Sequence, residues 1–133
     1  MTIEEIEKIF LNNGFVTAVF GKPDIGGIWN YPKTVPTLIN NRFIVYCALF
    51  FNKQNNCIEN CTEIYDTSKT TFILQNYLCV CPFKQELPLL TEEKMLKVIN
   101  NQKELYNKMM KIVKQIMIDE KINDLEKDFV KER

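Results

Sequence analysis

The five cysteines are the residues of this chain best suited to metal or redox chemistry. Cys57 and Cys61 are separated by three residues and Cys79 and Cys81 by one, and four thiolates can hold a zinc ion. The spacing differs from the two-residue knuckle of zinc ribbons. Cys47, Cys79 and Cys81 also lie in apolar, strand-like sequence, where cysteine is usually a small buried hydrophobe. We therefore expect buried structural thiols and no stoichiometric zinc, with zinc or a redox disulfide as the alternatives.

Carboxylates offer a second possible chemistry. Asp24, Glu59, Glu63 and Asp66 lie in or near predicted turns, but no two of them have the spacing of a catalytic pair, and we expect them to face water. The chain has no histidine, which removes the imidazole base and the commonest metal ligand. These observations predict a protein that is not an enzyme and holds no cofactor or metal. A histidine-free enzyme that uses a carboxylate or a cysteine is the weakest alternative.

The composition predicts one domain with no electrostatic preference for nucleic acid. The 133 residues are enough for a single core, and 17 basic residues balance 17 acidic ones. Arg42 and Arg133 are the only arginines, although arginine is the usual reader of phosphate and guanine. We expect neither sequence-specific nucleic-acid recognition nor binding to a membrane surface.

The start of the chain predicts an intracellular protein. The sequence MTIEEIEKIF is acidic and amphipathic, and it lacks the basic start, apolar centre and cleavage site of a signal peptide. The longest apolar run, FIVYCALFF at 43–51, is about half as long as a membrane-spanning helix. The expected location is therefore the host cytoplasm or a virion.

Hydrophobic spacing predicts an α+β fold in one domain, 1–133. Thr2 and Glu5 form a capping box for an N-terminal helix. The sequences FVTAVF, RFIVYCALFFNK, TEIYD and TTFILQNYLCVCPF are typical of strands, which together predict an antiparallel sheet of about four strands. The second of these is so apolar that we expect a central strand with both faces covered. The N-terminal helix and the sheet with its loops occupy 1–90.

Residues 91–133 predict a long C-terminal helix packed on one face of the sheet. Thr91 is a good N-cap, and Glu92 and Glu93 suit the first turn. About 40 helical residues span roughly 60 Å, whereas a domain of this size is only about 35 to 40 Å across. The helix must either overhang the domain or break near 119–123. Overhanging apolar residues need cover, which predicts partner-binding residues Ile122, Leu125 and Phe129.

The stretch GKPDIGGIWNYPKTVP, residues 21–36, predicts a long irregular loop. It combines glycines that permit tight turns with prolines that forbid a helix. In one interpretation Trp29 folds back as a lid on the core. In the other the loop projects as an arm whose apolar residues anchor a partner. The partner-binding residues predicted here are Ile25, Ile28, Trp29 and Tyr31.

The order of these predicted elements resembles that of phage tail-terminator and neck-connector proteins. The resemblance covers about residues 3–118 and rests on the helix IEEIEKIF, the loop ending KTVPTL, the strand-rich sequences RFIVYCALFF and TTFILQNYLCVCPF, and the final helix. Those proteins are small α+β subunits that form rings at the head–tail junction through loops and sheet edges. The final helix is longer here, and no family residue carries over to this chain.

The resemblance implies a non-enzymatic viral assembly subunit. We expect its partners to be other protein subunits in a homo-oligomer or ring. The alternative is a small phage-type inhibitor or adaptor that binds a single host protein through the same surfaces.

Overall fold

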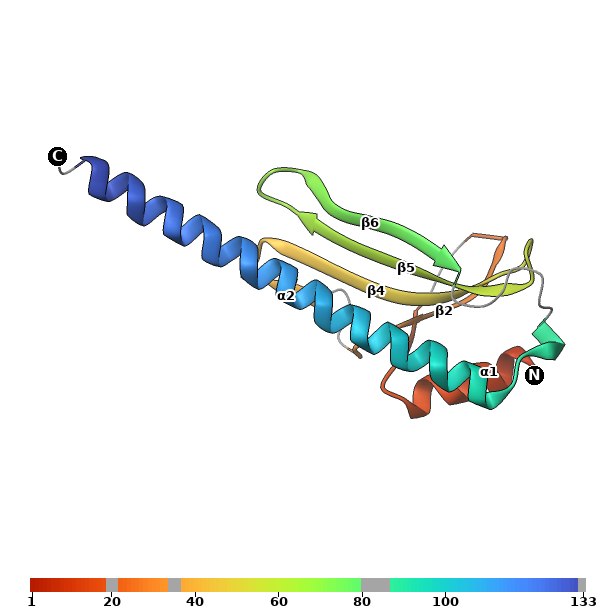
Figure 1. Ribbon diagram of the computed structural model, residues 1–133. Coiled ribbons are helices and arrows are strands. Elements are labelled where there is room, and N and C mark those ends of the chain that lie inside the picture. Colours follow the sequence, from red (N-terminus) through yellow and green to blue (C-terminus); the bar gives the residue numbers. More distant parts are fainter. Residues whose placement is uncertain (19–21, 34–36, 80–86, 132–133) are drawn as a thin grey trace.

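The computed structural model in Figure 1 describes residues 1–18, 22–33, 37–79 and 87–131; the side chains of 37, 76–79, 88 and 128–131 are also outside the description. Helix α1 (Ile3–Asn12) begins after Thr2, whose hydroxyl accepts a hydrogen bond from the Glu5 backbone N–H at 3.2 Å. This is the N-cap contact that the capping box predicts. Helix α1 buries Ile6 and Phe10.

Six antiparallel strands form one sheet. They are β1 (Val16–Ala18), β2 (Ile25–Asn30), β3 (Thr37–Ile39), β4 (Phe43–Asn52), β5 (Cys57–Asp66) and β6 (Thr71–Cys79). The order is β1-β2-β4-β5-β6, and β3 pairs with β4. Strand β5 pairs with the whole of β4 along one edge of β4. Strands β2 and β3 share the other edge of β4, β2 along residues 48–52 and β3 along 43–45.

The predicted α+β fold class is confirmed, but the sheet has six strands rather than about four. One of the additional strands, β2, passes through the middle of the predicted irregular loop. A Cβ on Gly26 would lie 2.5 Å from the Phe51 ring, and a Cβ on Gly27 would lie 2.8 Å from the Trp29 ring. The two glycines therefore make room for aromatic rings on the sheet, whereas the sequence interpretation assigned them to turns.

Helix α2 (Glu92–Lys131) is continuous over 40 residues, with no break near 119–123. A short 3₁₀ helix, η1 (Leu87–Leu89), precedes it. In Figure 1 α2 crosses one face of the sheet, and its C-terminal part extends past the ends of the strands on the side of the β5–β6 turn. The overhang that the helix length predicts is therefore present. Below, "the overhang" means residues 121–131.

The face of the sheet that α2 covers holds the core in two clusters. The first joins α1, β2, β4 and the first turns of α2 and includes Phe10, Phe15, Trp29, Leu49 and Met95. The second joins β3, β4 and β5 to the middle of α2 and includes Phe43, Val45, Ile64, Met109 and Val113. Alternate residues of β4 point into this face, as the two-residue period of a strand requires.

A buried amide lies on α2 between the clusters. Gln102 donates hydrogen bonds from Nε2 to the Cys47 Sγ at 3.1 Å and to the Ala48 carbonyl at 3.0 Å. Its Oε1 accepts a hydrogen bond from Asn60 Nδ2 at 3.1 Å. Every polar atom of the amide thus has a partner, so this polar group can be buried without a large penalty and it fixes the register of α2 on the sheet.

Candidate interaction surfaces

Trp29, the central residue of the predicted arm, is completely buried. Its ring lies 4.8 Å from the Phe10 ring, and its Nε1 donates to Glu7 Oε2 at 3.2 Å. An indole placed in this way contributes a large apolar area to the core. The lid interpretation therefore describes its position, and the prediction of an exposed anchor is wrong for Trp29.

The other residues predicted on that stretch also belong to the folded domain. Ile28 is buried, whereas Ile25 and Tyr31 are partly buried. The Tyr31 ring meets the Tyr106 ring of α2 edge-on at 5.4 Å and lies 5.3 Å from Phe15. Since β2 pairs with β4, none of the four predicted residues is carried on a projecting arm.

The predicted residues of the overhang have a different environment. Ile122 is 49% exposed and Leu125 is 61% exposed, and Ile118, one turn earlier, is 51% exposed. The sequence interpretation missed Ile118, although it precedes Ile122 and Leu125 at the i, i+4, i+7 spacing of one helix face. Phe129 continues this spacing in the sequence, but its side chain lies outside the described residues. Ile118, Ile122 and Leu125 are called the outward stripe below.

The outward stripe points away from the sheet. Glu120 lies on the sheet side of α2, because its carboxylate bonds to Arg42 at the start of β4. At ~100° per residue, the stripe lies about 140 to 200° around the helix from Glu120. Upstream, the residues on this outward face are exposed and polar: Lys97, Asn100, Glu104, Asn107, Lys111 and Gln115. The outward face therefore changes from polar to apolar as α2 leaves the sheet.

A cluster of three charged residues attaches α2 to the sheet where β4 begins and β5 ends. Arg42 donates to both carboxylate oxygens of Asp66 at 3.0 and 2.8 Å and to both oxygens of Glu120. Asp66 also accepts hydrogen bonds from the backbone N–H and the hydroxyl of Ser68 at 3.0 and 2.7 Å. We call Arg42, Asp66 and Glu120 the Arg42 clamp. Two-pronged arginine–carboxylate contacts of this kind fix geometry as well as charge.

The clamp corrects the prediction that Asp66 faces water. Asp66 is buried at the end of β5, and the hydrogen bonds from Arg42 hold its carboxyl pKa well below the ordinary value. Arg42 also lowers the pKa of Glu120, which is partly exposed. Both carboxylates are therefore ionised at neutral pH.

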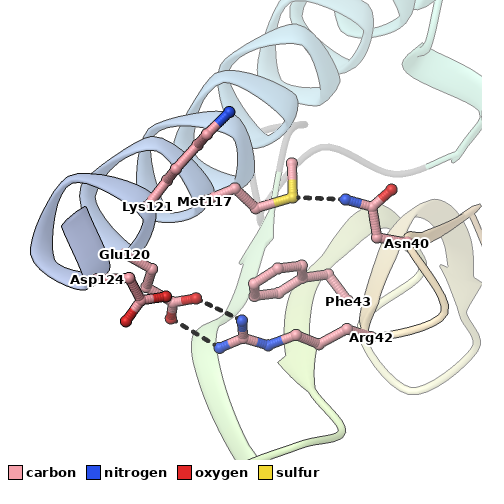
Figure 2. A pocket seen from close by; sticks show the side chains of 7 residues that line it. All are labelled: Asn40, Arg42, Phe43, Met117, Glu120, Lys121 and Asp124. Atoms are coloured by element: carbon pink, nitrogen blue, oxygen red, sulfur yellow. Dashed lines mark hydrogen bonds and ion pairs between the residues drawn. The ribbon is translucent and has the colours of Figure 1, made fainter. Parts of the chain in front are cut away.

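The clamp borders an open pocket of about 300 Å³, shown in Figure 2. Its lining residues are Asn40, Arg42, Phe43, Met117, Glu120, Lys121 and Asp124. The guanidinium already makes four hydrogen bonds to carboxylates, so it has little capacity left for an anionic ligand. Asn40 Nδ2 donates to Met117 Sδ at 3.0 Å and adds a further link between the turn and α2. We therefore assign this cluster a structural role.

The described cysteines are placed as structural residues. Cys47, Cys57 and Cys61 are buried, and burial raises the pKa of the Cys47 thiol to about 12. A thiol of such high pKa is a poor nucleophile at neutral pH. Within 1–18, 22–33, 37–79 and 87–131, no three His, Cys, Asp or Glu side chains are grouped as a metal site requires. The Cys79 side chain and Cys81 lie outside the described residues.

The sheet face opposite α2 carries a second apolar surface. Leu38, Ile44, Tyr65 and Phe72 are direct cross-strand neighbours from β3 to β6, and the Tyr65 and Phe72 rings lie 4.9 Å apart. Leu38 and Phe72 are about half exposed. The expectation that both faces of β4 are covered is therefore wrong at this end, because α2 covers only one face.

The described helices include none with the length and hydropathy needed to cross a membrane. No protein-family model, no curated protein and no solved structure matches the chain.

Proposed function

We propose that this protein is a non-enzymatic subunit of a protein assembly and that the outward stripe is one of its contact surfaces. The observation that carries the proposal is the change on the outward face of α2. Where the helix lies on the sheet, this face is polar and solvated, as is usual for a surface helix. Beyond the sheet, where no core is within reach, the same face presents exposed isoleucine and leucine.

Aliphatic side chains at these positions add nothing to the core of the domain that bears them. Three large apolar residues in one row on a projecting helix are typical of a surface that another protein covers. The row of Leu38, Ile44, Tyr65 and Phe72 offers a second surface of the same chemistry. A subunit with two such surfaces can contact two neighbours at once, as a ring or larger assembly requires.

Within this class, the order of elements favours a viral ring or connector subunit. A small adaptor that binds a single host protein is the alternative, and the same apolar stripe would serve it. The mass of the particle separates the two, because a ring contains many copies of the 15.7 kDa chain and an adaptor complex contains one or two.

Native mass spectrometry of the tagged full chain, purified from its natural source, tests the proposal. We expect a particle heavier than a single chain. The Ile122→Asp variant should give a lighter particle, because it loses subunits or partners. The matched control is Ile112→Asp, because Ile112 is an equally bulky residue of the same helix and is 40% exposed outside the stripe. A particle that is unchanged by Ile122→Asp, or a single chain throughout, would contradict the proposal.

A further inference from the structure

We infer that the outward stripe binds the same stripe of a second copy of this chain, as a short parallel coiled coil. The inference rests on the proposed function and names the partner at that surface. Three observations carry it: the spacing of the apolar residues, the charges beside them, and the direction in which the stripe faces.

The spacing matches a heptad repeat. Ile118, Ile122 and Leu125 occupy successive d, a and d positions, and Phe129 falls at the next a position in the sequence. Isoleucine at a with leucine at d is the combination that favours two parallel strands. The residues one heptad earlier at these positions, Lys111 and Gln115, are polar. The repeat therefore begins where α2 leaves the sheet, and it does not extend along the domain.

The charges beside the stripe are complementary to a second copy in the same direction. Lys114 and Lys121 occupy g positions, and Asp119 and Glu126 occupy e positions. In a parallel pair each g residue lies next to the e residue of the following heptad on the other chain. Lys114 then meets Asp119, and Lys121 meets Glu126, on both sides of the pair.

The opposite direction is less favourable. An antiparallel pair sets e positions against e positions, which brings Glu126 of one chain close to Asp119 of the other. Like charges at such short range weaken the pair. The charge pattern thus fits a partner with the same sequence and favours the parallel direction.

The structure also makes the contact sterically and entropically accessible. The stripe faces away from the sheet of its own chain, so a second helix can approach without meeting that domain. The Arg42 clamp holds Glu120 at the start of β4, and α2 is already helical through the overhang. A short apolar repeat can then associate, because little conformational freedom remains to be lost.

Sedimentation equilibrium of the full chain, from micromolar to near-millimolar concentration, tests the inference. We expect a monomer–dimer equilibrium. Ile122→Asp should raise the dissociation constant by at least about 100-fold, because it puts a charge into the apolar seam. The control Ile112→Asp should leave it unchanged, and circular dichroism should show that both variants are folded.

Charge exchange tests the direction. Lys121→Glu and Glu126→Lys should each raise the dissociation constant, by roughly tenfold, since each replaces two attractions with two repulsions. The double variant should restore the affinity of the unaltered chain, and an equimolar mixture of the two single variants should form a heterodimer. Tighter binding by Glu126→Lys would overturn the parallel arrangement, because that change relieves the repulsion of an antiparallel pair.

A chain that stays monomeric over the whole concentration range would overturn the second copy as partner. The proposed function would then be judged separately, by the effect of Ile122→Asp on the mass of the particle from the natural source. If both measurements show a single chain, the inference and the proposed function both fail.

Discussion

The two parts of helix α2 use their faces in opposite ways. Up to Met117 the buried apolar side chains, such as Met95, Met109 and Val113, point to the sheet, and the outward face is polar; Leu96 and Ile112 are exposed on the flanks of the helix. From Ile118 onward the last described contact with the sheet is the ion pair between Glu120 and Arg42. The exposed apolar residues of the outward stripe lie on the opposite side of the helix. Since both parts belong to one continuous helix, propensity does not explain the difference. It reflects what each part has beside it.

Two polar contacts, that of Gln102 and the Arg42 clamp, fix the position of α2 along the sheet. Gln102 is buried between the two core clusters, and the Arg42 clamp lies beside the second cluster, where β4 begins and β5 ends. Both contacts demand specific geometry, whereas apolar packing alone would allow α2 to slide by a turn. They therefore fix which part of the helix lies on the sheet and which part projects beyond it.

If this comparison is correct, substitutions in the core beneath the sheet-covered part of α2 change folding stability, and those in the overhang change association. The largest effect is expected for Trp29→Ala. Removing a fully buried aromatic side chain should lower the free energy of unfolding by about 3 to 5 kcal/mol. Urea unfolding in the Ile122→Asp background measures this without a contribution from association. A loss below about 1 kcal/mol would mean that Trp29 is not part of the core.

A smaller loss, of about 1 to 3 kcal/mol, is expected for Gln102→Ala. The substitution removes three hydrogen bonds from a buried network and leaves polar partners on β4 and β5 without them. Asn101→Ala, at an exposed neighbouring position, is the control and should change stability by less than about 0.5 kcal/mol. Equal effects of the two variants would show that Gln102 does not hold the register of α2.

The Arg42 clamp should make stability depend on pH in the acid range. Asp66 and Glu120 have lowered pKa values, so their contribution is complete above the ordinary carboxyl pKa, near 4. It is lost as the pH falls towards the lowered values in the folded protein. Asp66→Asn should therefore lower the thermal midpoint at pH 7 by several degrees and reduce its further fall between pH 5 and pH 2. An identical pH profile for the variant would exclude the clamp as a source of this dependence.

The smallest effect on stability is expected from deletion of 121–133, which retains Glu120 and the clamp. We expect the far-ultraviolet circular dichroism to lose only the signal of about three helical turns, and the unfolding midpoint at low concentration to stay nearly constant. Association through the outward stripe should be lost. If the shortened chain is unfolded, the overhang belongs to the core and the comparison between the two parts of α2 is wrong.

Elements with local signals could be predicted from the amino-acid sequence alone. The capping box of α1, the length of α2 and the apolar strands β4 and β6 follow from spacing and propensity, because nearest neighbours along the chain dictate them. The overhang followed from comparing helix length with domain size. Strand β2 was missed because its glycines signal a turn. Gly26 leaves room for the ring of Phe51, a residue of β4 that comes close only after the two strands have paired.

The candidate site was predictable only in part, for the same reason. Ile122 and Leu125 were found from helical spacing, whereas Ile118 follows directly after the core residues Ile116 and Met117 and can be separated from them only when the sheet side of α2 is known. The Arg42 clamp joins residues up to 78 positions apart, so no local sequence pattern predicts it. The tertiary structure decided which face of α2 meets the sheet and where that contact ends, because both depend on packing between elements distant in the chain.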